Sequence, residues 1–253
     1  MLEKTQGIVL HLLRYQDDSV IADIYTASRG ALGFLVRMPR SRKNALRTML
    51  LRPLNILELE FDYRPNQNLQ RLRSVQTGVA YHSLPYEPMK EAVALFLSEF
   101  LYHALKNEDR NMPLFQYLKS GLQWFDEART GTANFHLVFL MRLTRFLGFW
   151  PDISVGHRLD RPQHGHFRMQ GFFDLRDGVM SAQPPLHDAY LSLEESAAAP
   201  FILHMDFHTI HLYRLSREQR NRILEVLTVY YRLHVAEFPE LKSLGILREV
   251  IGA

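Results

Sequence analysis

Residues 54–61 read LNILELEF, and their alternation decides the fold expected for the start of the chain. Leu57, Leu59 and Phe61 fall on one face of an extended strand, and two glutamates fall on the other. A helix would need apolar residues three or four positions apart, which this segment lacks. It is therefore expected to be a β-strand with one buried face.

Four further segments of this kind surround that strand, each rich in apolar or β-branched residues and bounded by turn residues. They are residues 5–14, 19–26, 31–38 and 69–77. The expected turns between strands include residues 15–18, 28–30 and 64–68. Five short strands within residues 1–80 predict a small closed or nearly closed barrel, for which the OB-fold is the best-known solution. An SH3-like or other small barrel stays open as the alternative.

A basic run follows the third strand. Residues 33–54 read GFLVRMPRSRKNALRTMLLRPL and contain no acidic residue. Their basic residues are Arg37, Arg40, Arg42, Lys43, Arg47 and Arg52. Such side chains repel one another unless a polyanion or counterions lie among them, so the run is either a phosphate-binding loop or a solvated hairpin tip. Arg64, Arg71 and Arg73 would join this basic surface if the last two strands lie beside it.

Beyond residue 85 the apolar residues recur at helical spacing. Helices are expected over residues 88–106, 112–128, 134–149 and 215–238. Residues 151–200 are rich in Gly, Pro and His, with a hairpin pattern at residues 171–180. The sequence thus predicts an α+β protein, with an OB-fold domain at residues 1–80 and a helical bundle domain at residues 81–253 that carries an irregular insertion.

Composition narrows the functions that this 253-residue chain can have. The net charge of +3 is mild, so affinity for nucleic acid would have to come from local clusters. The chain has no cysteine, which excludes disulfides, thiolate zinc sites and cysteine nucleophiles. No apolar run approaches the roughly 20 residues of a membrane helix. The start of the chain lacks the features of a secretory signal, so the cytoplasm is the expected location.

A metal-dependent hydrolase is one alternative function. His204, His208 and His211 would share a face if their segment, HMDFHTIH, were helical, and such spacing can ligate a metal. The glutamate of an HExxH motif is missing, and the P-loop and GxSxG motifs are also absent, so neither a metal nor a catalytic residue is expected. Another alternative is a protein-interaction adaptor whose basic loop binds an acidic protein.

Several of these patterns together resemble the RecO family of bacterial DNA recombination and repair mediators. The first is the N-terminal hairpin with its turn at Gly30, followed by the basic Arg-Ser-Arg-Lys segment at residues 40–43. The second is RFLGFWPD at residues 145–152, and the third is LKSLGILREV at residues 241–250. These patterns occur in the order found in the family and extend over most of the chain.

The resemblance implies an OB-fold, a helical bundle, and neither a catalytic centre nor a cofactor. It implies binding to single- and double-stranded DNA, strand annealing and, together with RecR, loading of the RecA recombinase onto DNA coated by single-strand-binding protein (SSB). The DNA contacts would fall on Arg37, Arg40, Arg42, Lys43, Arg47, Arg64, Arg71 and Arg73.

The resemblance also implies a pocket in the helical domain, apolar and basic-rimmed, for the acidic, phenylalanine-ending tail of SSB. Arg142 and Arg145 of the central helix are the candidate contacts, although arginines so placed more often pair with glutamates of neighbouring helices. Many family members hold zinc after this helix with two CxxC pairs. Because this chain has no cysteine, a metal-free hairpin is expected there instead.

Overall fold

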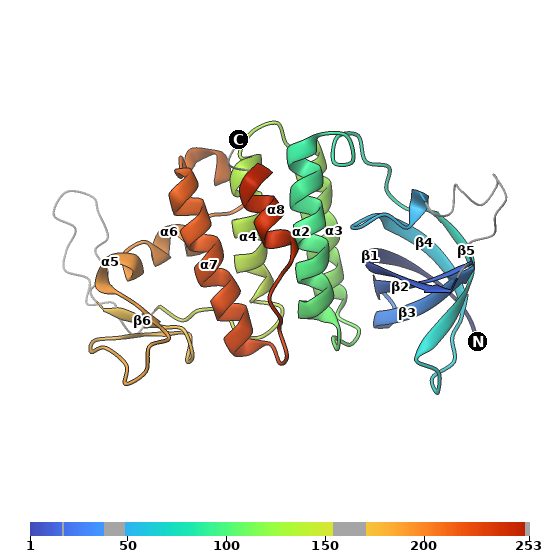
Figure 1. The fold of residues 1–253 in the computed structure, drawn as a ribbon, viewed down its shortest axis with the longest axis horizontal. Coiled ribbons are helices and arrows are strands. Elements are labelled where there is room, and N and C mark those ends of the chain that lie inside the picture. The colour runs from blue at the N-terminus through green and yellow to red at the C-terminus, as the bar shows by residue number, and fades with distance from the viewer. Residues whose placement is uncertain (17, 38–48, 154–170, 251–253) are drawn as a thin grey trace. The chain divides into compact units, whose positions relative to one another are not determined.

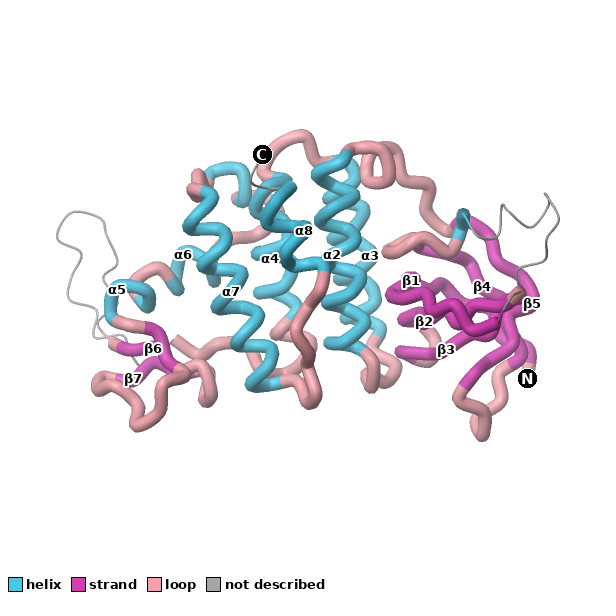
Figure 2. Tube along the Cα trace, viewed as in Figure 1, coloured by secondary structure: helices cyan, strands magenta, loops and turns pink. Residues whose placement is uncertain are grey.

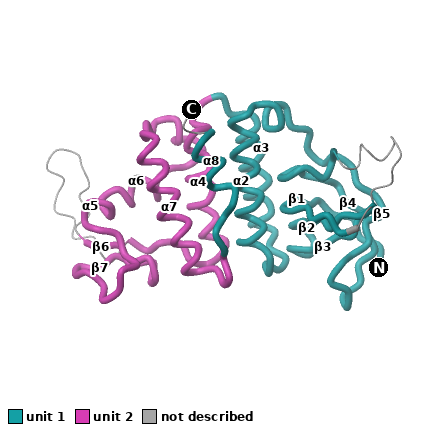
Figure 3. The backbone as a smooth tube through the Cα atoms, viewed as in Figure 1, with its two compact units in different colours: residues 1–129, 239–253 teal, residues 130–238 magenta. Residues whose placement is uncertain are grey.

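The computed structural model describes residues 1–16, 18–37, 49–153 and 171–250 (Figure 1). Four predicted DNA contacts, Arg40, Arg42, Lys43 and Arg47, lie outside the described residues. The chain divides into two compact units, Met1–Arg129 together with Pro239–Ala253, and Thr130–Phe238 (Figure 3).

The first unit begins with a closed five-stranded barrel. Its strands are β1 (Leu2–Gln16), β2 (Ser19–Thr26), β3 (Gly30–Arg37), β4 (Ile56–Asp62) and β5 (Leu69–Thr77). They follow one another around the barrel in the order β1-β2-β3-β5-β4, and β4 pairs with β1 to close it. All pairs are antiparallel except β3 with β5. The expected OB-like barrel is confirmed. The turn expected at residues 15–18 is shorter, because β1 continues to Gln16.

The alternation seen in the sequence builds the barrel interior. Leu57, Leu59 and Phe61 of β4 are all buried in the core, as expected for one face of that strand. Phe34 from β3 is completely buried and meets the Phe61 ring edge to face, with centroids 5.1 Å apart. Fully burying such an aromatic side chain contributes about 2–3 kcal/mol. Phe34 is therefore a core residue of the barrel.

Helices cover one part of the barrel (Figure 2). The helices of this unit are α2 (Pro88–Leu105), α3 (Met112–Glu127) and α8 (Ser243–Val250). The Ser98 hydroxyl of α2 donates a hydrogen bond to the carbonyl of Leu10 in β1. The Tyr25 ring of β2 stacks on Phe115 of α3 at 6.5 Å. The barrel and α2–α3 are thus joined by both polar and aromatic contacts.

The turn between β2 and β3 requires glycine. Gly30 has φ +74°, a left-handed conformation, and a Cβ there would lie 2.3 Å from the carbonyl oxygen of Glu108. The backbone N–H of Ala31 donates to that same oxygen at 3.0 Å. A side chain at residue 30 would therefore separate the barrel from the loop after α2.

A buried polar cluster ties the segment before α2 to the end of α3. The carboxylate of Asp126 accepts hydrogen bonds from three backbone N–H groups, at residues 82–84. The buried Lys90 ammonium donates to the carbonyls of Asp126 and Ala128, both at 2.9 Å. Burial opposes the ionisation of Asp126, but the N–H donors and Lys90 outweigh it and lower the pKa of that carboxyl.

The second unit combines helices with a small sheet. Its helices include α4 (Phe135–Leu143), α5 (Leu193–Ser196), α6 (Ala199–His204) and α7 (Arg217–His234). Its strands are β6 (Phe172–Asp174), β7 (Val179–Ser181) and β8 (Tyr190–Leu191), in the order β7-β6-β8. The hairpin expected at residues 171–180 is confirmed as β6 and β7. Asp174 accepts from two backbone N–H groups of the β6–β7 turn, and its other oxygen lies 3.2 Å from His187 Nε2.

Helix α4 is shorter than the predicted helix at residues 134–149. It ends at Leu143, where the Thr144 hydroxyl donates back to the carbonyl of Met141 at 2.7 Å. Tight turns then continue the chain to Gly148, which has φ +85°. A threonine hydroxyl that bonds the preceding turn competes with helical hydrogen bonds, and apolar periodicity alone does not reveal this.

Candidate nucleic-acid interface and partner pocket

The outward face of β1, β2 and β3 has two halves. In the first, His11 pairs with Asp23 across the strands and its ring stacks on Tyr102 of α2, with centroids 4.5 Å apart. In the second, Leu13 lies opposite Ile21, and Ile21 lies opposite Leu35. We call this second half the open face, because its leucines remain exposed: Leu13 by 51% and Leu35 by 36%.

Two arginines flank the open face. Leu35 is paired across the sheet with Arg71 of β5, and Arg37 lies two positions beyond Leu35 on the same side of β3. Both arginines are exposed, and neither forms an ion pair with any residue that the structure describes. The pairing of β3 with β5 therefore brings together two predicted DNA contacts that are far apart in the sequence.

The other two predicted contacts on this part of the barrel differ in their partners. Arg73 lies at the irregularity in the β4–β5 pairing, and its Nε donates to Asp62 Oδ2 at 2.6 Å. This hydrogen bond lowers the pKa of the Asp62 carboxyl. Arg64 is exposed in the β4–β5 turn, whose backbone is held by Gln70. Arg73 is thus already matched with an acid, whereas the Arg64 side chain has no ion pair among the described residues.

The apolar part of the open face was not predicted from the sequence. Leu13 and Leu35 belong to strands that were predicted, but they were not singled out as exposed. Tyr15 was assigned to a turn, yet it lies near the end of β1, at the break in the β1–β2 register between Arg14 and Gln16, and is 52% exposed. The detectable pattern is the alternation itself, because the side chains between the buried positions of a barrel strand point outward.

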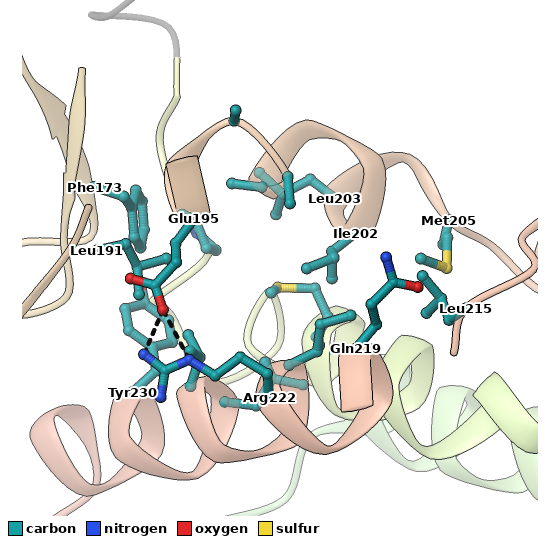
Figure 4. A pocket seen from close by; sticks show the side chains of 18 of the residues that line it. Phe173, Leu191, Glu195, Ile202, Leu203, Met205, Leu215, Gln219, Arg222 and Tyr230 are labelled. Atoms are coloured by element: carbon teal, nitrogen blue, oxygen red, sulfur yellow. Dashed lines mark hydrogen bonds and ion pairs between the residues drawn. The ribbon is translucent and has the colours of Figure 1, made fainter. Parts of the chain in front are cut away.

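The second unit contains an apolar cavity of about 790 Å³ between α6, α7 and the small sheet (Figure 4). Its apolar lining includes Leu191, Ile202, Leu203, Met205, Val226 and Tyr230. Polar side chains lining it include Glu194, Glu195, Arg214, Gln219 and Arg222. A concave apolar surface with a few polar groups is the usual form of a ligand or peptide pocket.

One ion pair lies at the cavity. Arg222 of α7 donates from Nε to Glu195 Oε1 at 2.8 Å, while Glu195 also closes the capping box of α5 with Ser192. Burial opposes the ionisation of Glu195, but these partners outweigh it and lower the pKa of its carboxyl. Arg214 is exposed and has no ion pair within the described part of the chain.

Arg142 and Arg145, the predicted partner contacts, do not line this cavity. Arg142 Nε donates to the carbonyl of Met205 at 3.0 Å, and its guanidinium lies 3.9 Å from Asp206. Arg145 lies over the ring of Trp150, 3.8 Å from its centroid. Arg142 therefore has an acidic partner within the protein, but it is an aspartate in a turn and not the glutamate of a neighbouring helix that was expected. Through the Met205 carbonyl, Arg142 also supports a segment of the cavity wall.

The three histidines of the hydrolase hypothesis are not on one helix, so the geometric premise of that hypothesis is wrong. Helix α6 ends at His204, and Asp206 accepts from the backbone N–H groups of His208 and Thr209 to form a turn. His211 belongs to a separate short 3-10 helix. Within the described ranges, no group of three or more His, Cys, Asp or Glu residues is arranged to hold a metal ion.

The fold defines the class of the protein: an OB-like barrel joined to helices and a small sheet, in a chain without cysteine. Each unit carries one candidate contact surface. No described helix is long and apolar enough to cross a membrane. The family models of the recombination protein O N terminus and C terminus match residues 1–79 and 88–245. The chain belongs to the RecO family of DNA repair proteins.

Relatives support this assignment over the whole chain. The DNA repair protein RecO of Phocaeicola vulgatus is 45% identical over 252 residues, which cover 100% of both chains. That of Bacteroides fragilis is 43% identical over 251 residues, 99% of each chain. That of Azobacteroides pseudotrichonymphae is 30% identical over 253 residues, again 99% of each. The family resemblance expected from the sequence is confirmed.

Proposed function

We propose that this protein is a non-enzymatic DNA-binding mediator of recombinational repair in the cytoplasm. It binds single- and double-stranded DNA, anneals complementary strands and, with RecR, helps to load RecA onto SSB-coated DNA. Full-length similarity to RecO proteins supports this proposal. The main support for DNA binding comes from two exposed arginines, Arg37 and Arg71. They lie on neighbouring strands, near the point where β3 continues into the acid-free basic run.

The proposed DNA contacts act on phosphates. They comprise Arg37, Arg40, Arg42, Lys43, Arg47, Arg64, Arg71 and Arg73. Each phosphate that they neutralise releases condensed counterions, so affinity falls as salt rises and depends little on sequence. Arg73 contributes least, because Asp62 already neutralises its guanidinium.

Salt-dependent binding tests this proposal. Affinity for single-stranded and duplex oligonucleotides is measured over a range of salt concentrations for the wild type and for Arg40→Ala/Arg42→Ala/Lys43→Ala. The variant should bind more weakly, with a shallower salt dependence by about 0.7 per lost phosphate contact on single strands. A matched control, Arg110→Ala/Arg129→Ala/Arg176→Ala, removes the same charge from exposed residues outside the barrel. Equal binding by both variants would contradict the assignment of the basic run.

The SSB tail is the proposed occupant of the cavity in the second unit. A phenylalanine side chain suits its apolar lining, and Arg214 and Arg222 offer charge to the tail's acidic residues and terminal carboxylate. We still propose that Arg142 and Arg145 contribute to binding of the SSB tail. Arg142 would do so indirectly, by holding the Met205 carbonyl in the cavity wall. Unchanged affinity for a tail peptide in Arg142→Ala/Arg145→Ala would contradict their role.

Two further measurements address the mediator role. Annealing of SSB-coated complementary oligonucleotides should be accelerated by the wild type and less by the triple variant of the basic run. Competition between an oligonucleotide and the tail peptide separates a mediator from a simple adaptor. A mediator holds both at once on different units, whereas an adaptor whose basic loop binds acidic protein would release one when it binds the other.

A further inference from the structure

The small sheet of the second unit forms one wall of the cavity, and Asp174 lies on the reverse side of that wall. Phe173 and Leu191 are paired in the sheet and lie at the same side of the cavity (Figure 4). Leu175 also lines the cavity. Because side chains alternate along a strand, Asp174 points away from the cavity, between Phe173 and Leu175. The contacts of Asp174 therefore hold the wall from behind.

His187 connects two parts of this sheet through its two ring nitrogens. Its Nε2 lies 3.2 Å from Asp174 Oδ2, and its Nδ1 accepts a hydrogen bond from the backbone N–H of Ala189 at 3.2 Å. The Ala189 carbonyl in turn accepts from the backbone N–H of Leu175 at 3.0 Å. The His187 ring and one backbone hydrogen bond thus join β6 to the residue just before β8.

These contacts define the protonation state of the His187 ring. A ring nitrogen that accepts a hydrogen bond carries no proton, so the proton of the neutral ring is on Nε2 and is donated to Asp174. A second proton, on Nδ1, would face the N–H of Ala189, donor against donor. Protonation would therefore break the link to Ala189 and leave the link to Asp174 in place.

The segment between β7 and β8 has few other attachments that could replace this link. Leu186 is fully exposed, and most of residues 182–188 are exposed with it. A segment that buries few apolar side chains is ordered mainly by its hydrogen bonds. The Ser181 hydroxyl donates to the Gln183 carbonyl at one end of the segment, and His187 forms the links at the other end.

The opposite end of the paired strands is held independently. The buried Ser196 hydroxyl donates to the Leu191 carbonyl at 3.2 Å and accepts from the backbone N–H of Phe173 at 2.9 Å. Loss of the His187 links therefore loosens one end of the cavity wall without unfolding the sheet.

The ionisable groups around His187 leave Asp174 as its one ion-pair partner among the described residues. The packed helices contribute Glu195 of α5, which is engaged by Arg222, and His234 of α7, which bonds the Leu175 carbonyl. The remaining ionisable side chains of the sheet and its connections are Asp152, Arg176, Asp177, Asp188 and Tyr190.

We infer that neutral His187 is a positioning residue of the cavity: it cross-links β6 to the start of β8, and its protonation loosens this wall and weakens binding of an apolar, acidic peptide. The inference rests on the proposed peptide binding and adds the regulation of that site by acid. Only molecules with a formed wall can bind, so affinity falls in proportion to their fraction. Histidine changes charge between about pH 5 and 8, which sets the range of the response.

Three substitutions at residue 187 separate the two links. His187→Asn keeps an acceptor near the position of Nδ1, His187→Gln keeps a donor near the position of Nε2, and His187→Ala keeps neither. At about pH 7.5, affinity for an SSB tail peptide should fall about fivefold in the alanine variant and less in the other two. From about pH 7.5 to about pH 5.5, the wild-type affinity should fall to that of His187→Gln, which itself should not change.

Two further readouts do not depend on the peptide. The ¹⁵N chemical shifts of the His187 ring should show the Nε2–H tautomer at neutral pH. Hydrogen exchange of the Leu175 and Ala189 amides, measured at one neutral pH, should be faster in His187→Ala than in the wild type.

Matched controls remove other histidines near the cavity. His204 and His234 hydrogen-bond to the carbonyls of Pro200 and Leu175. His204→Gln and His234→Gln should each keep the wild-type dependence of peptide affinity on pH, and His204→Gln should keep the wild-type amide exchange. Circular dichroism checks that every variant is folded.

The outcomes distinguish two failures. A wild-type pH dependence that persists in His187→Gln, or that disappears in His234→Gln, overturns the inference. Equal amide exchange in the wild type and His187→Ala does the same. If the wild type binds no peptide at either pH while His187→Ala exchanges faster, the proposed peptide site is wrong and the role of His187 in holding the wall stands.

Discussion

The open face of the barrel and the cavity of the second unit are the two candidate contact surfaces, and they differ in shape and in the state of their charges. The open face is a row of exposed side chains bordered by Arg37 and Arg71, which have no acidic partner among the described residues. The cavity is concave and apolar, and its Arg222 is already paired with Glu195. The first surface suits a long polyanion with little sequence preference, whereas the second suits one short segment that fits its shape.

The largest expected effect comes from placing a charge in the cavity. Ile202→Asp should weaken binding of an SSB tail peptide by at least about a hundredfold, because a desolvated carboxylate costs several kcal/mol and repels an acidic ligand. Fluorescence anisotropy with a labelled peptide measures this. Leu186→Asp, at a fully exposed leucine of the same unit that does not line the cavity, is the control. DNA affinity should not change in either variant, and a parallel loss would mean that the two surfaces are not separate.

The next largest effect tests whether the cavity of the second unit still binds peptide when the first unit is destabilised. Asp126→Ala leaves three backbone N–H groups without their acceptor and removes the carboxylate near Lys90, which should lower the free energy of unfolding of the first unit by about 3 kcal/mol. Because the folded-state pKa of Asp126 is lowered, its stabilisation is complete above the ordinary pKa of aspartate and is lost as pH falls through the lowered value.

Chemical denaturation at neutral and acidic pH checks this prediction. The difference between wild type and Asp126→Ala should shrink in acid, and peptide affinity of the folded variant should equal that of the wild type. A difference that is constant with pH would mean that the Asp126 charge contributes nothing.

An intermediate effect is expected on the open face. Arg37→Ala/Arg71→Ala should weaken single-strand binding roughly tenfold at moderate salt, since two charge-assisted phosphate contacts are lost. Arg73→Ala should change the affinity much less, because the wild-type guanidinium is already held by Asp62. Equal losses in Arg71→Ala and Arg73→Ala would show that the ion pair with Asp62 does not decide availability for DNA.

The smallest effect concerns competition within the cavity. Glu195→Gln removes the carboxylate that occupies Arg222 and should raise affinity for the acidic tail peptide about threefold, the scale of an exposed ion pair. Glu194→Gln makes the same change of charge at a neighbouring exposed lining residue for which no ion pair is seen in the described ranges. If both variants gain equally, net charge rather than release of Arg222 is the cause.

The barrel could be predicted from sequence because its determinants are local. The alternation of apolar residues predicted the bounds of β4 and β5 to within two residues, and the buried face of β4 contains the residues expected. The hairpin at residues 171–180 was also visible as two apolar stretches around a turn. The third strand of the small sheet, β8, could not be predicted, because two residues are too few to show any periodicity.

The candidate sites were less predictable, because they depend on contacts between distant residues. Arg71 and Arg73 look alike in sequence, and only the fold shows that Asp62 engages one of them. His204, His208 and His211 have a helical spacing, but Asp206 bonds to the backbone after it and forms a turn. Arg222, which is paired at the cavity, was not singled out, since its partner Glu195 comes from a short helix far away in sequence.

The closed barrel also limits how other molecules can associate with it. Each barrel strand has a hydrogen-bonded neighbour on each side along part of its length, so no described barrel strand is a free edge over its whole length. The shortest of these pairings joins β3 and β5 over Gly33–Leu35. Among the described strands, β7 and β8 are the outer strands of the small sheet of the second unit, and β7 is partly covered by a bridge from Asp152 to Val179. Because only short stretches of barrel backbone stay unpaired, partners of the barrel are expected to recognise mainly its side chains, so single substitutions on its outer face should change their affinity.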